Sequence, residues 1–146
     1  MAAKPGDDGC VFCDIVAGQA PASMVHEDDA AVAFLDIRPL NAGHVLVVPR
    51  VHAACLADLD PGLGGHLFGV AQRMAAGLRR SGLPCEGVNL FLADGAAAFQ
   101  EVFHVHLHVI PRHAGDGFRI QAKWRLPGRG ELDATAERVR QGIAAP

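Results

Sequence analysis

The chain contains no tyrosine and one tryptophan, and aromatic residues make up 5% of its 146 residues. Charged residues are also sparse, at 20%, and the formal net charge of -3 excludes the strongly basic surface typical of nucleic-acid-binding proteins. No apolar run approaches the ~20 residues that a membrane-spanning helix requires. Because 50% of the residues are hydrophobic, a disordered chain is excluded as well. We expect one compact domain that acts as an enzyme or binds a small ligand.

The chain also has few cysteines, four in all, which is too few for a disulfide-stabilised scaffold of this length. Only Cys10 and Cys13 are closely spaced, and this spacing is typical of metal or redox chemistry in a reducing compartment. We interpret Cys55 and Cys85 as ordinary core residues. Because the N-terminus lacks the apolar centre of a secretory signal, we expect a cytoplasmic protein.

Hydrophobic patterns and turn residues predict strands joined by short turns, with one long helix inserted. Asp60 is a good N-cap and Pro61 suits the first helical position, so a helix begins there and its apolar stripe continues to Leu78. Residues 10–18 form either a short helix or an extended hook, and residues 131–142 have helical spacing. The pattern predicts an antiparallel sheet of an α+β fold. The expected strands cover residues 23–26, 30–35, 44–49, 87–93 and 103–110.

Three of the eight histidines alternate along the last of these strands, at His104, His106 and His108. Alternate side chains of a strand point to the same face, so the pattern predicts a row of three imidazoles, with the apolar residues between them facing the core. An imidazole can act as nucleophile, acid, base or metal ligand near neutral pH. The row therefore indicates a catalytic site or, alternatively, a catalytic metal centre whose nearest carboxylates are Glu101 and Asp116.

The segment HVHLHVI at residues 104–110 resembles the signature of the histidine triad (HIT) superfamily of nucleotide hydrolases and transferases, in which three histidines alternate with apolar residues. Other segments resemble the family in the expected order, and together they cover the chain from Cys10 to Phe118. These segments are CVFCDIV (residues 10–16), EDD (27–29), AFLDI (33–37), GHVLVVP (43–49) and VN (88–89).

The resemblance implies an architecture: a HIT-like antiparallel β-sheet of about five strands with one main helix and a C-terminal helix. It implies a HIT domain over residues 10–120, preceded by a flexible N-terminal segment, residues 1–9. A C-terminal extension, residues 121–146, would pack on the same domain. Family members generally pair as two-fold dimers that cover an exposed sheet edge, so we expect a homodimer with Trp124 at the partner's site. No nucleic acid, membrane or organic cofactor is implied.

The resemblance also implies a reaction. His106 would attack the α-phosphorus of a purine nucleoside 5'-monophosphate joined to an amine or phosphate leaving group, and water would then hydrolyse the nucleotidyl-histidine intermediate. His108 and His44 would bind phosphate oxygens and orient the row, of which His104 is the first member. In the family's dinucleotide transferase branches a glutamine replaces the third histidine, so His108 favours hydrolysis.

A set of nucleotide-binding residues follows from the same resemblance. Asp36 resembles the family's ribose-binding acid, and Phe34 and Ile37 would sandwich the base. Asn89 matches a family position near the phosphate or the ribose. By position alone, Asp36 also suits a turn or a helix cap and Asn89 a polar strand end, so both alternatives stay open.

The segment before the histidine row departs from the family. Many members have Gly-Gln-Ser or Gly-Gln-Thr, whose hydroxyl and backbone donors meet the phosphate and the leaving group, whereas this chain has Phe99, Gln100 and Glu101. Phe99 removes a conformationally permissive glycine, and Glu101 places a carboxylate where a hydroxyl would lie. We expect Gln100 and Glu101 to contact the nucleotide, and we expect an altered leaving-group preference.

Zinc-containing members of the family imply a metal site at Cys10, Cys13, His52 and His104. Two thiolates and two imidazoles would form a closed tetrahedral zinc site, which is structural and supports folding. The alternative is a pair of buried thiols with His52 on the surface.

Two other functions stay open. The departures at Phe99 and Glu101 leave room for a nucleotide-binding regulatory protein with little activity. The histidine row leaves room for a metal-dependent hydrolase that uses these imidazoles as ligands.

Overall fold

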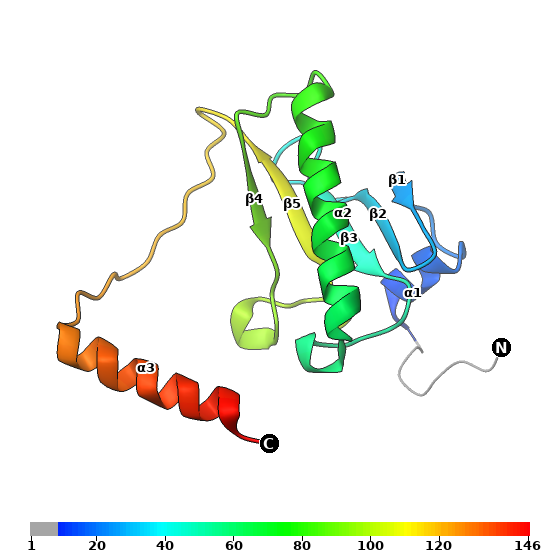
Figure 1. Ribbon diagram of the computed structural model, residues 1–146. Coiled ribbons are helices and arrows are strands. Elements are labelled where there is room, and N and C mark those ends of the chain that lie inside the picture. The colour runs from blue at the N-terminus through cyan, green and yellow to red at the C-terminus, as the bar shows by residue number, and fades with distance from the viewer. Residues whose placement is uncertain (1–8) are drawn as a thin grey trace.

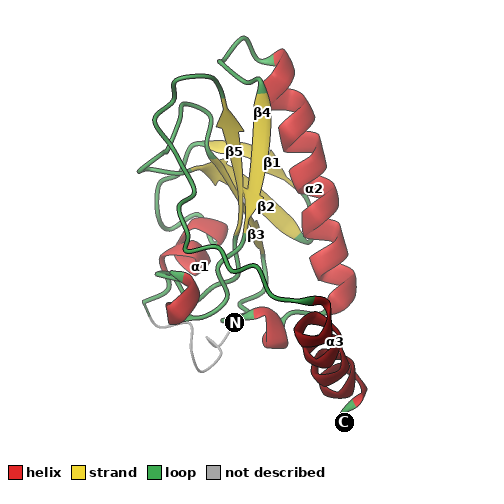
Figure 2. Cartoon of the chain, turned by 90° about the vertical axis from the view of Figure 1, so that its left-hand side faces the viewer, coloured by secondary structure: helices red, strands yellow, loops and turns green. Residues whose placement is uncertain are grey.

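Five strands form one antiparallel sheet with the order β1-β2-β3-β5-β4. The computed structural model describes residues 9–146 of the chain. Helix α2 lies on one face of the sheet and the short helix α1 on the other (Figure 1, Figure 2). This arrangement confirms the predicted α+β fold with one main helix and a C-terminal helix. The elements are α1 (Val11–Val16), β1 (Met24–Glu27), β2 (Ala31–Leu35), β3 (Val45–Pro49), η1 (Leu56–Asp58), α2 (Pro61–Arg80), β4 (Gly87–Phe91), η2 (Ala96–Ala98), β5 (Leu107–Arg112) and α3 (Arg129–Ala144).

Helix α2 begins where the sequence predicts. The Asp60 carboxylate accepts a hydrogen bond from the backbone N–H of Leu63 at 3.1 Å, and Pro61 occupies the first position, where its missing N–H costs nothing. The buried side chains of α2 join residues of β2, β3 and β5 in one apolar core. These side chains are Leu67, Val70, Ala71 and Leu78.

Strand β3 is buried on both faces. Val45 and Val47 belong to the core under α2, whereas Leu46 and Val48 belong to a second apolar cluster with Phe12 of α1. A strand that is covered on both sides needs a continuous apolar sequence, and this one has it. Leu46 also pairs with His108 across the ladder, so the sheet face under α1 is the face that carries this histidine.

A close approach between the start of β3 and the end of α2 requires glycine at position 43. Gly43 has a φ of +94°, and a Cβ at this position would lie 2.8 Å from Cδ2 of Leu78. Only glycine combines this left-handed backbone with the space available. The turn therefore fixes the backbone immediately before His44.

Strand β5 begins later than the sequence predicts. The predicted strand includes all three histidines, but the ladder starts at Leu107, opposite Val47. The partner strand ends at Pro49, which has no N–H to donate, and the N–H of Val105 donates instead to the carbonyl oxygen of Ala53 at 2.8 Å. The predicted alternation still holds, because the apolar residues between the histidines pack into the core under α2.

The N-terminal segment is helical, which resolves the alternatives left by the sequence. Cys10 is the N-cap of α1, and its Sγ accepts a hydrogen bond from the N–H of Cys13 at 3.4 Å. Phe12 is buried under the helix. The flexible segment expected at residues 1–9 lies, apart from Gly9, outside the described residues.

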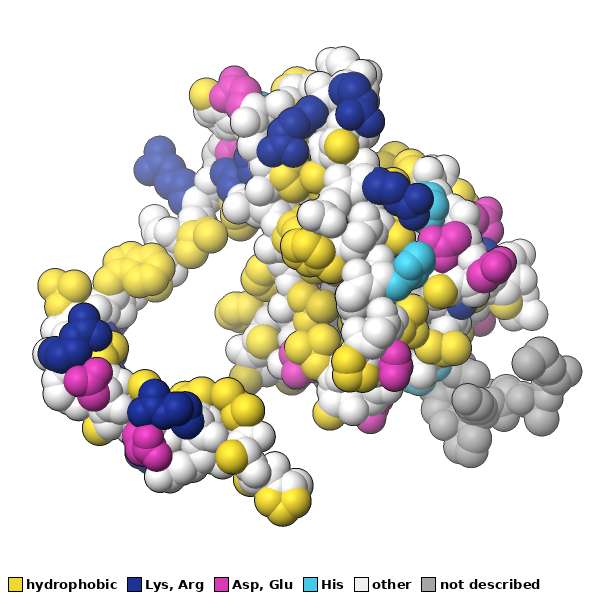
Figure 3. All heavy atoms as spheres, viewed as in Figure 1, with side chains coloured by type: hydrophobic (Ala, Val, Ile, Leu, Met, Phe, Trp, Pro, Cys, Tyr) yellow, Lys and Arg dark blue, Asp and Glu magenta, His cyan; other side chains and the backbone are white. Residues whose placement is uncertain are grey.

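The C-terminal extension differs from the expectation that residues 121–146 pack on the same domain. Helix α3 has no buried residue, and it lies apart from the sheet at the end of an extended segment (Figure 1, Figure 3). Its larger apolar side chains, Leu132, Val139 and Ile143, recur at helical spacing, yet they are 42%, 56% and 80% exposed, so nothing in the described chain covers this side of the helix. Within residues 9–146, no helix is both long enough and apolar enough to cross a membrane.

Candidate functional site

A pocket of about 360 Å³ lies on the sheet face that α1 covers. Most of its wall is apolar. The wall comes from α1, β2, β3 and β4, from the loops that follow α1 and β2, and from the loop before β5, and two members of the histidine row complete it. A cavity of this kind, apolar with a few polar groups, is typical of small-molecule sites. The apolar lining residues include Phe12, Ile15, Phe34, Leu46 and Phe91, and the charged lining residues are Asp36, Arg38 and Glu101.

His106 lines the pocket with 7% of its surface exposed. Its Nδ1 lies 2.8 Å from the carbonyl oxygen of His104. Since a carbonyl oxygen only accepts, Nδ1 must carry the proton of this hydrogen bond. In the neutral ring the lone pair is therefore on Nε2, the atom that a nucleophilic histidine needs.

Hydrogen bonds also determine the tautomers of His44 and His108. The backbone N–H of Leu40 donates to Nδ1 of His44 at 3.1 Å, so in neutral His44 the proton lies on Nε2. The Nε2–H of His44 then donates a hydrogen bond to Nδ1 of His108, at 2.8 Å between the two nitrogens. Neutral His108 then carries its own proton on Nε2. The chain of bonds provides one N–H donor beside His106, whose ring centroid lies 5.0 Å from that of His108.

The surroundings of both rings favour their neutral forms. Burial lowers the pKa of His44, although the Asp36 carboxylate, 3.7 Å from its Nε2, opposes the shift. Burial lowers the pKa of His108 to about 4, and the neighbouring imidazoles of His106 and His44 add to the shift by repelling a further positive charge. At neutral pH, His44 and His108 therefore act as hydrogen-bonding groups and not as cations.

The structure places Phe34, Asp36 and Ile37, the residues expected to bind the base and the ribose, in the lining of the pocket. Phe34 is buried, whereas Ile37 is exposed at the rim. Asp36 accepts a hydrogen bond from the N–H of Arg38 at 2.8 Å, so it also has the turn-forming role that position alone suggests.

Phe12 also lines the pocket, although the sequence did not predict this role. The residue lies between Cys10 and Cys13, which were predicted as metal ligands. Its ring contacts the edges of Phe34 and His106, with centroid distances of 5.5 and 5.1 Å. The sequence could not assign this aromatic residue to the pocket, because the assignment depends on where the short helix α1 packs on the sheet.

Gln100 and Asn89 are not among the described residues that line the pocket. The Gln100 amide accepts from the N–H of Gly95 at 2.8 Å and donates to the carbonyl oxygens of Ala54 and Val102 at 2.7 and 3.1 Å. It therefore holds the loop before the histidines. Asn89 accepts a hydrogen bond at 2.7 Å from the guanidinium of Arg112, itself bound to Asp116. The contacts of Asn89 are those of a polar strand residue.

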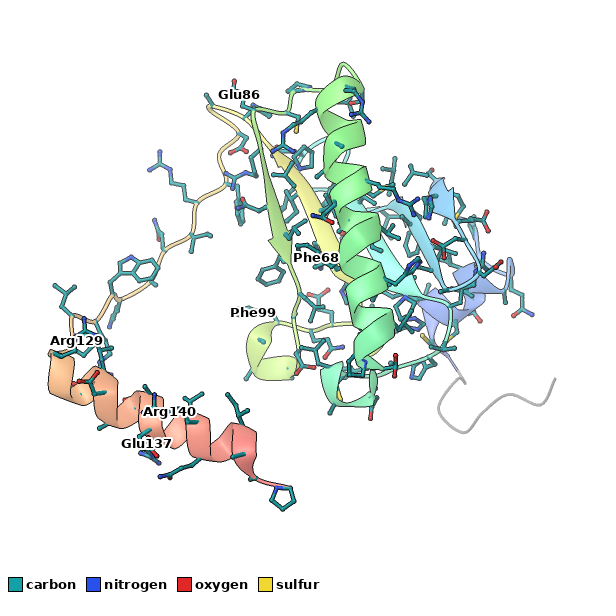
Figure 4. The ribbon with its side chains drawn as sticks, viewed as in Figure 1. Phe68, Glu86, Phe99, Arg129, Glu137 and Arg140 are labelled. Carbon is teal, nitrogen blue, oxygen red and sulfur yellow. The ribbon has the colours of Figure 1, made fainter. Side chains whose placement is uncertain are left out.

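Phe99 and Glu101, the two residues that differ from the family pattern, both line the pocket. Phe99 projects from the loop between β4 and β5 (Figure 4) and has a φ of +69°, the left-handed conformation that glycine adopts readily. The backbone thus keeps the glycine-like shape although the side chain is large. Glu101 lies 2.6 Å from Nη2 of Arg38, an ion pair that the sequence analysis did not foresee.

His104 belongs to a cluster of sulfur and nitrogen ligands below α1. Its Nδ1 lies 3.5 Å from the Sγ atoms of both Cys10 and Cys13, and Nδ1 of His52 lies 3.3 Å from Sγ of Cys13. One ligand atom from each of the four residues lies within 4.8 Å of the others. Nε2 of His104 donates to the carbonyl oxygen of Pro49 at 2.8 Å, which leaves Nδ1 as the ligand atom. In most histidine metal sites the ring nitrogen that does not bind the metal donates a hydrogen bond in this way. Two thiols and two imidazoles so arranged fit a tetrahedral zinc ion.

The histidine row is divided between two groups. His104 lies with the cysteines, whereas His108 lies with His44 and Asp36, in a second group whose ligand atoms are also within 4.8 Å of one another. In residues 9–146 no group of potential ligands contains all three members of the row. The geometry therefore does not favour a metal centre built on the row.

Comparison with known proteins gives a consistent result. Residues 17–115 match the HIT domain. An uncharacterized HIT-like protein of Mycobacterium tuberculosis is 40% identical over 135 residues, which is 92% of this chain and 93% of that protein. The adenylylsulfatase HINT3 of Arabidopsis thaliana is 34% identical over 107 residues, 73% of this chain and 54% of that protein. The crystal structure of a zinc-bound histidine triad family protein from Mycobacterium smegmatis has a TM-score of 0.75 at 42% identity, covering 94% of this chain and 99% of that chain. The chain described here belongs to the HIT family.

Proposed function

We propose that this protein is a nucleotide hydrolase that releases a purine nucleoside 5'-monophosphate from an amine or phosphate leaving group. The observation that carries the proposal is the hydrogen bond from Nδ1 of His106 to the carbonyl oxygen of His104, at 2.8 Å. It leaves the Nε2 lone pair of a pocket-lining imidazole available, beside a second imidazole that supplies an N–H donor.

In the first step, Nε2 of His106 attacks the α-phosphorus and the bond from phosphorus to the leaving group breaks. The leaving atom keeps the electron pair of the broken bond and takes its proton from water, while Nε2–H of His108 keeps its proton and donates a hydrogen bond to an oxygen of the transferring phosphoryl group. The Nδ1–H of the nucleotidyl-histidine keeps its hydrogen bond to the backbone, so the ring does not rotate. In the second step a water molecule attacks phosphorus and releases its proton to solvent, the bond to His106 breaks, and the electron pair of that bond returns to Nε2 of His106.

The apolar part of the pocket suits the nucleoside. The rings and aliphatic groups of Phe12, Ile15, Phe34 and Leu46 would contact the flat face of a base. The Asp36 carboxylate can accept hydrogen bonds from ribose hydroxyls, since its contact with the N–H of Arg38 occupies one of its two oxygens. The adenylylsulfatase relative acts on a nucleotide derivative by its name, and this supports a nucleotide substrate here.

The test is release of AMP from adenosine 5'-phosphoramidate and from a dinucleoside polyphosphate, with His106→Ala as the comparison. Turnover that disappears in the variant, while folding and AMP binding persist, supports a histidine nucleophile. Tight AMP binding by the wild type with no turnover of either compound would instead support the nucleotide-binding regulatory protein. Turnover that stops on chelation and returns with added metal, at unchanged stability, would support a metal-dependent hydrolase.

We propose in addition that Cys10, Cys13, His52 and His104 hold one structural zinc ion. The zinc-bound relative from M. smegmatis supports this assignment. All four positions would be filled by protein, so the ion would have no open site for substrate. Its contribution would be to fasten α1, and with it Phe12, to the residues before β5.

We propose a cytoplasmic homodimer. The four cysteines form no disulfide in the described part of the chain, which suits a reducing compartment. Ile120 and, in the C-terminal extension, Trp124 and Leu126 are at least 70% exposed, and a second copy would cover such side chains. Light scattering on the wild type and on Trp124→Ala measures this: a dimeric mass for the wild type that falls in the variant supports the proposal, and a monomeric mass for both contradicts it.

A further inference from the structure

An ion pair joins the two segments that border the pocket. Nη2 of Arg38, in the loop after β2, lies 2.6 Å from Oε2 of Glu101, in the loop before β5. Both residues line the pocket, yet their side chains are 78% and 72% exposed. His106 is by contrast 7% exposed. The pair therefore lies at the mouth of the pocket, while the reacting nitrogen lies at its inner end.

Arg38 is the only lysine or arginine among the described residues that line the pocket. The other charged lining groups are the carboxylates of Asp36 and Glu101. The two imidazoles of His44 and His108 are neutral at pH 7, because burial lowers the pKa of each ring. Apart from the imidazole of His106, the guanidinium is thus the one group of these lining residues that offers a positive charge to a substrate whose phosphates are anionic.

The guanidinium has donors left for a second partner. Arginine has five N–H donors, and the Arg38 guanidinium donates one hydrogen bond to Glu101. The pair is exposed, so a carboxylate of Glu101 is held weakly and a substrate oxyanion can replace it. A cationic leaving group at the same place would lie against the guanidinium and be repelled.

We propose that Arg38 is a specificity-determining residue that contacts an anionic leaving group, a second phosphate or a sulfate, and that Glu101 holds the guanidinium at the mouth until that group arrives. The inference rests on the proposed hydrolase function and names its substrate class. Nucleoside 5'-monophosphates joined to an anion are then preferred over those joined to an uncharged amine. This role explains why the chain has Glu101 where many family members have serine or threonine. A hydroxyl group could not neutralise the charge of Arg38 in the empty pocket.

The first experiment measures binding and does not require turnover. In a His106→Ala background, calorimetry gives the affinities for ADP and AMP, which differ by one anionic group beyond the α-phosphate. Replacing Arg38 by glutamine should lower the ratio of the ADP affinity to the AMP affinity about tenfold, since a charge-assisted hydrogen bond is lost. Arg38→Lys should restore part of the ratio, and Glu101→Gln should raise it by removing a competitor. An unchanged ratio in Arg38→Gln overturns the inference, whether or not the protein is a hydrolase.

The second experiment measures kcat/KM for diadenosine triphosphate, adenosine 5'-phosphosulfate and adenosine 5'-phosphoramidate. Arg38→Gln should lower the values for the first two relative to the third, mainly through KM, and the larger loss identifies phosphate or sulfate as the better fit. Equal losses for all three compounds overturn the leaving-group assignment. The matched control is Arg140→Gln, which removes an arginine that pairs with Glu137 at 2.8 Å on α3 (Figure 4). If the wild type turns over none of the compounds, the proposed function fails, and the binding ratio still decides the role of Arg38.

Discussion

Nε2 of His44 lies 2.8 Å from Nδ1 of His108, although 64 residues separate them in the sequence. The contact joins the start of β3 to β5 and determines which nitrogen of His108 carries the proton. A donor on Nε2 of His108 exists because His44 donates to the other nitrogen, and His44 can donate because the Leu40 N–H occupies its Nδ1.

Replacing His44 by phenylalanine should therefore lower kcat for adenosine 5'-phosphoramidate by about tenfold, the effect of weakening one hydrogen bond to the charged phosphoryl group. The ring volume is nearly kept, but His108 loses the donor that selects its tautomer. The ¹⁵N chemical shifts of His108 should show a mixture of tautomers in the variant and one tautomer in the wild type. A single unchanged tautomer would contradict this account of the pair.

The protonation of His108 should follow its lowered pKa. Burial, together with the nearby imidazoles, lowers that pKa to about 4, whereas an unfolded histidine titrates near its ordinary value of 6.5. As the pH falls below about 6.5, the unfolded state takes up a proton that the folded state refuses until about 4. This contribution to stability is therefore complete above pH 6.5 and is lost as the pH falls toward 4.

Urea unfolding at pH 7 and pH 5 measures this loss. The wild type should be less stable at pH 5, and His108→Asn should lose less stability between the two pH values because it lacks the titrating ring. An equal loss in both proteins would assign the pH dependence to other groups, among them the thiols of the zinc site.

Removal of zinc should unfold or loosen α1. We expect about one zinc ion per chain by elemental analysis, in keeping with a closed four-ligand site. Chelation should lower the melting temperature and weaken AMP binding, because Phe12 lies on the helix that the ion fastens. Cys13→Ser should show the same two losses without a chelator, whereas Cys55→Ser should show neither. Full stability and AMP affinity in a metal-free sample would contradict a structural zinc ion.

The left-handed backbone at Phe99 predicts a difference between two variants that both lack the ring. Phe99→Gly should be more stable than Phe99→Ala by about 1 kcal/mol, since only glycine adopts this conformation without a steric cost. Both should bind AMP less tightly if the ring contacts the nucleotide at the pocket rim. Chemical denaturation compares the stabilities, and equal values for the two variants would show that the backbone relaxes.

Much of the fold could be predicted because it depends on local patterns. Alternation at His104, His106 and His108 indicates one face of a strand wherever that strand lies, and Asp60 with Pro61 marks a helix start in any context. The start of β5 could not be predicted, because it depends on where Pro49 ends the neighbouring strand.

The parts of the site that could not be predicted depend on contacts between distant segments. Nothing near Arg38 in the sequence indicates that its partner is Glu101, and the buried hydrogen bonds of Gln100 become visible only when the carbonyl groups around it are placed. The resemblance to a family suggested that Gln100 and Asn89 contact the nucleotide, whereas their side chains bond to the protein itself.

The pairing of β3 with β5 has a consequence for the order of folding. Val47 pairs with Leu107, and the whole of α2 and β4 lies in the segment between them. Closing so long a segment has a large entropic cost, which slows the formation of such contacts relative to hairpins and helices. His44 and His108 meet only when this step is complete. A partly folded chain with an intact β1-β2 hairpin and α2 therefore has no nucleotide pocket, and recovery of AMP binding during refolding should report the last stage of sheet assembly.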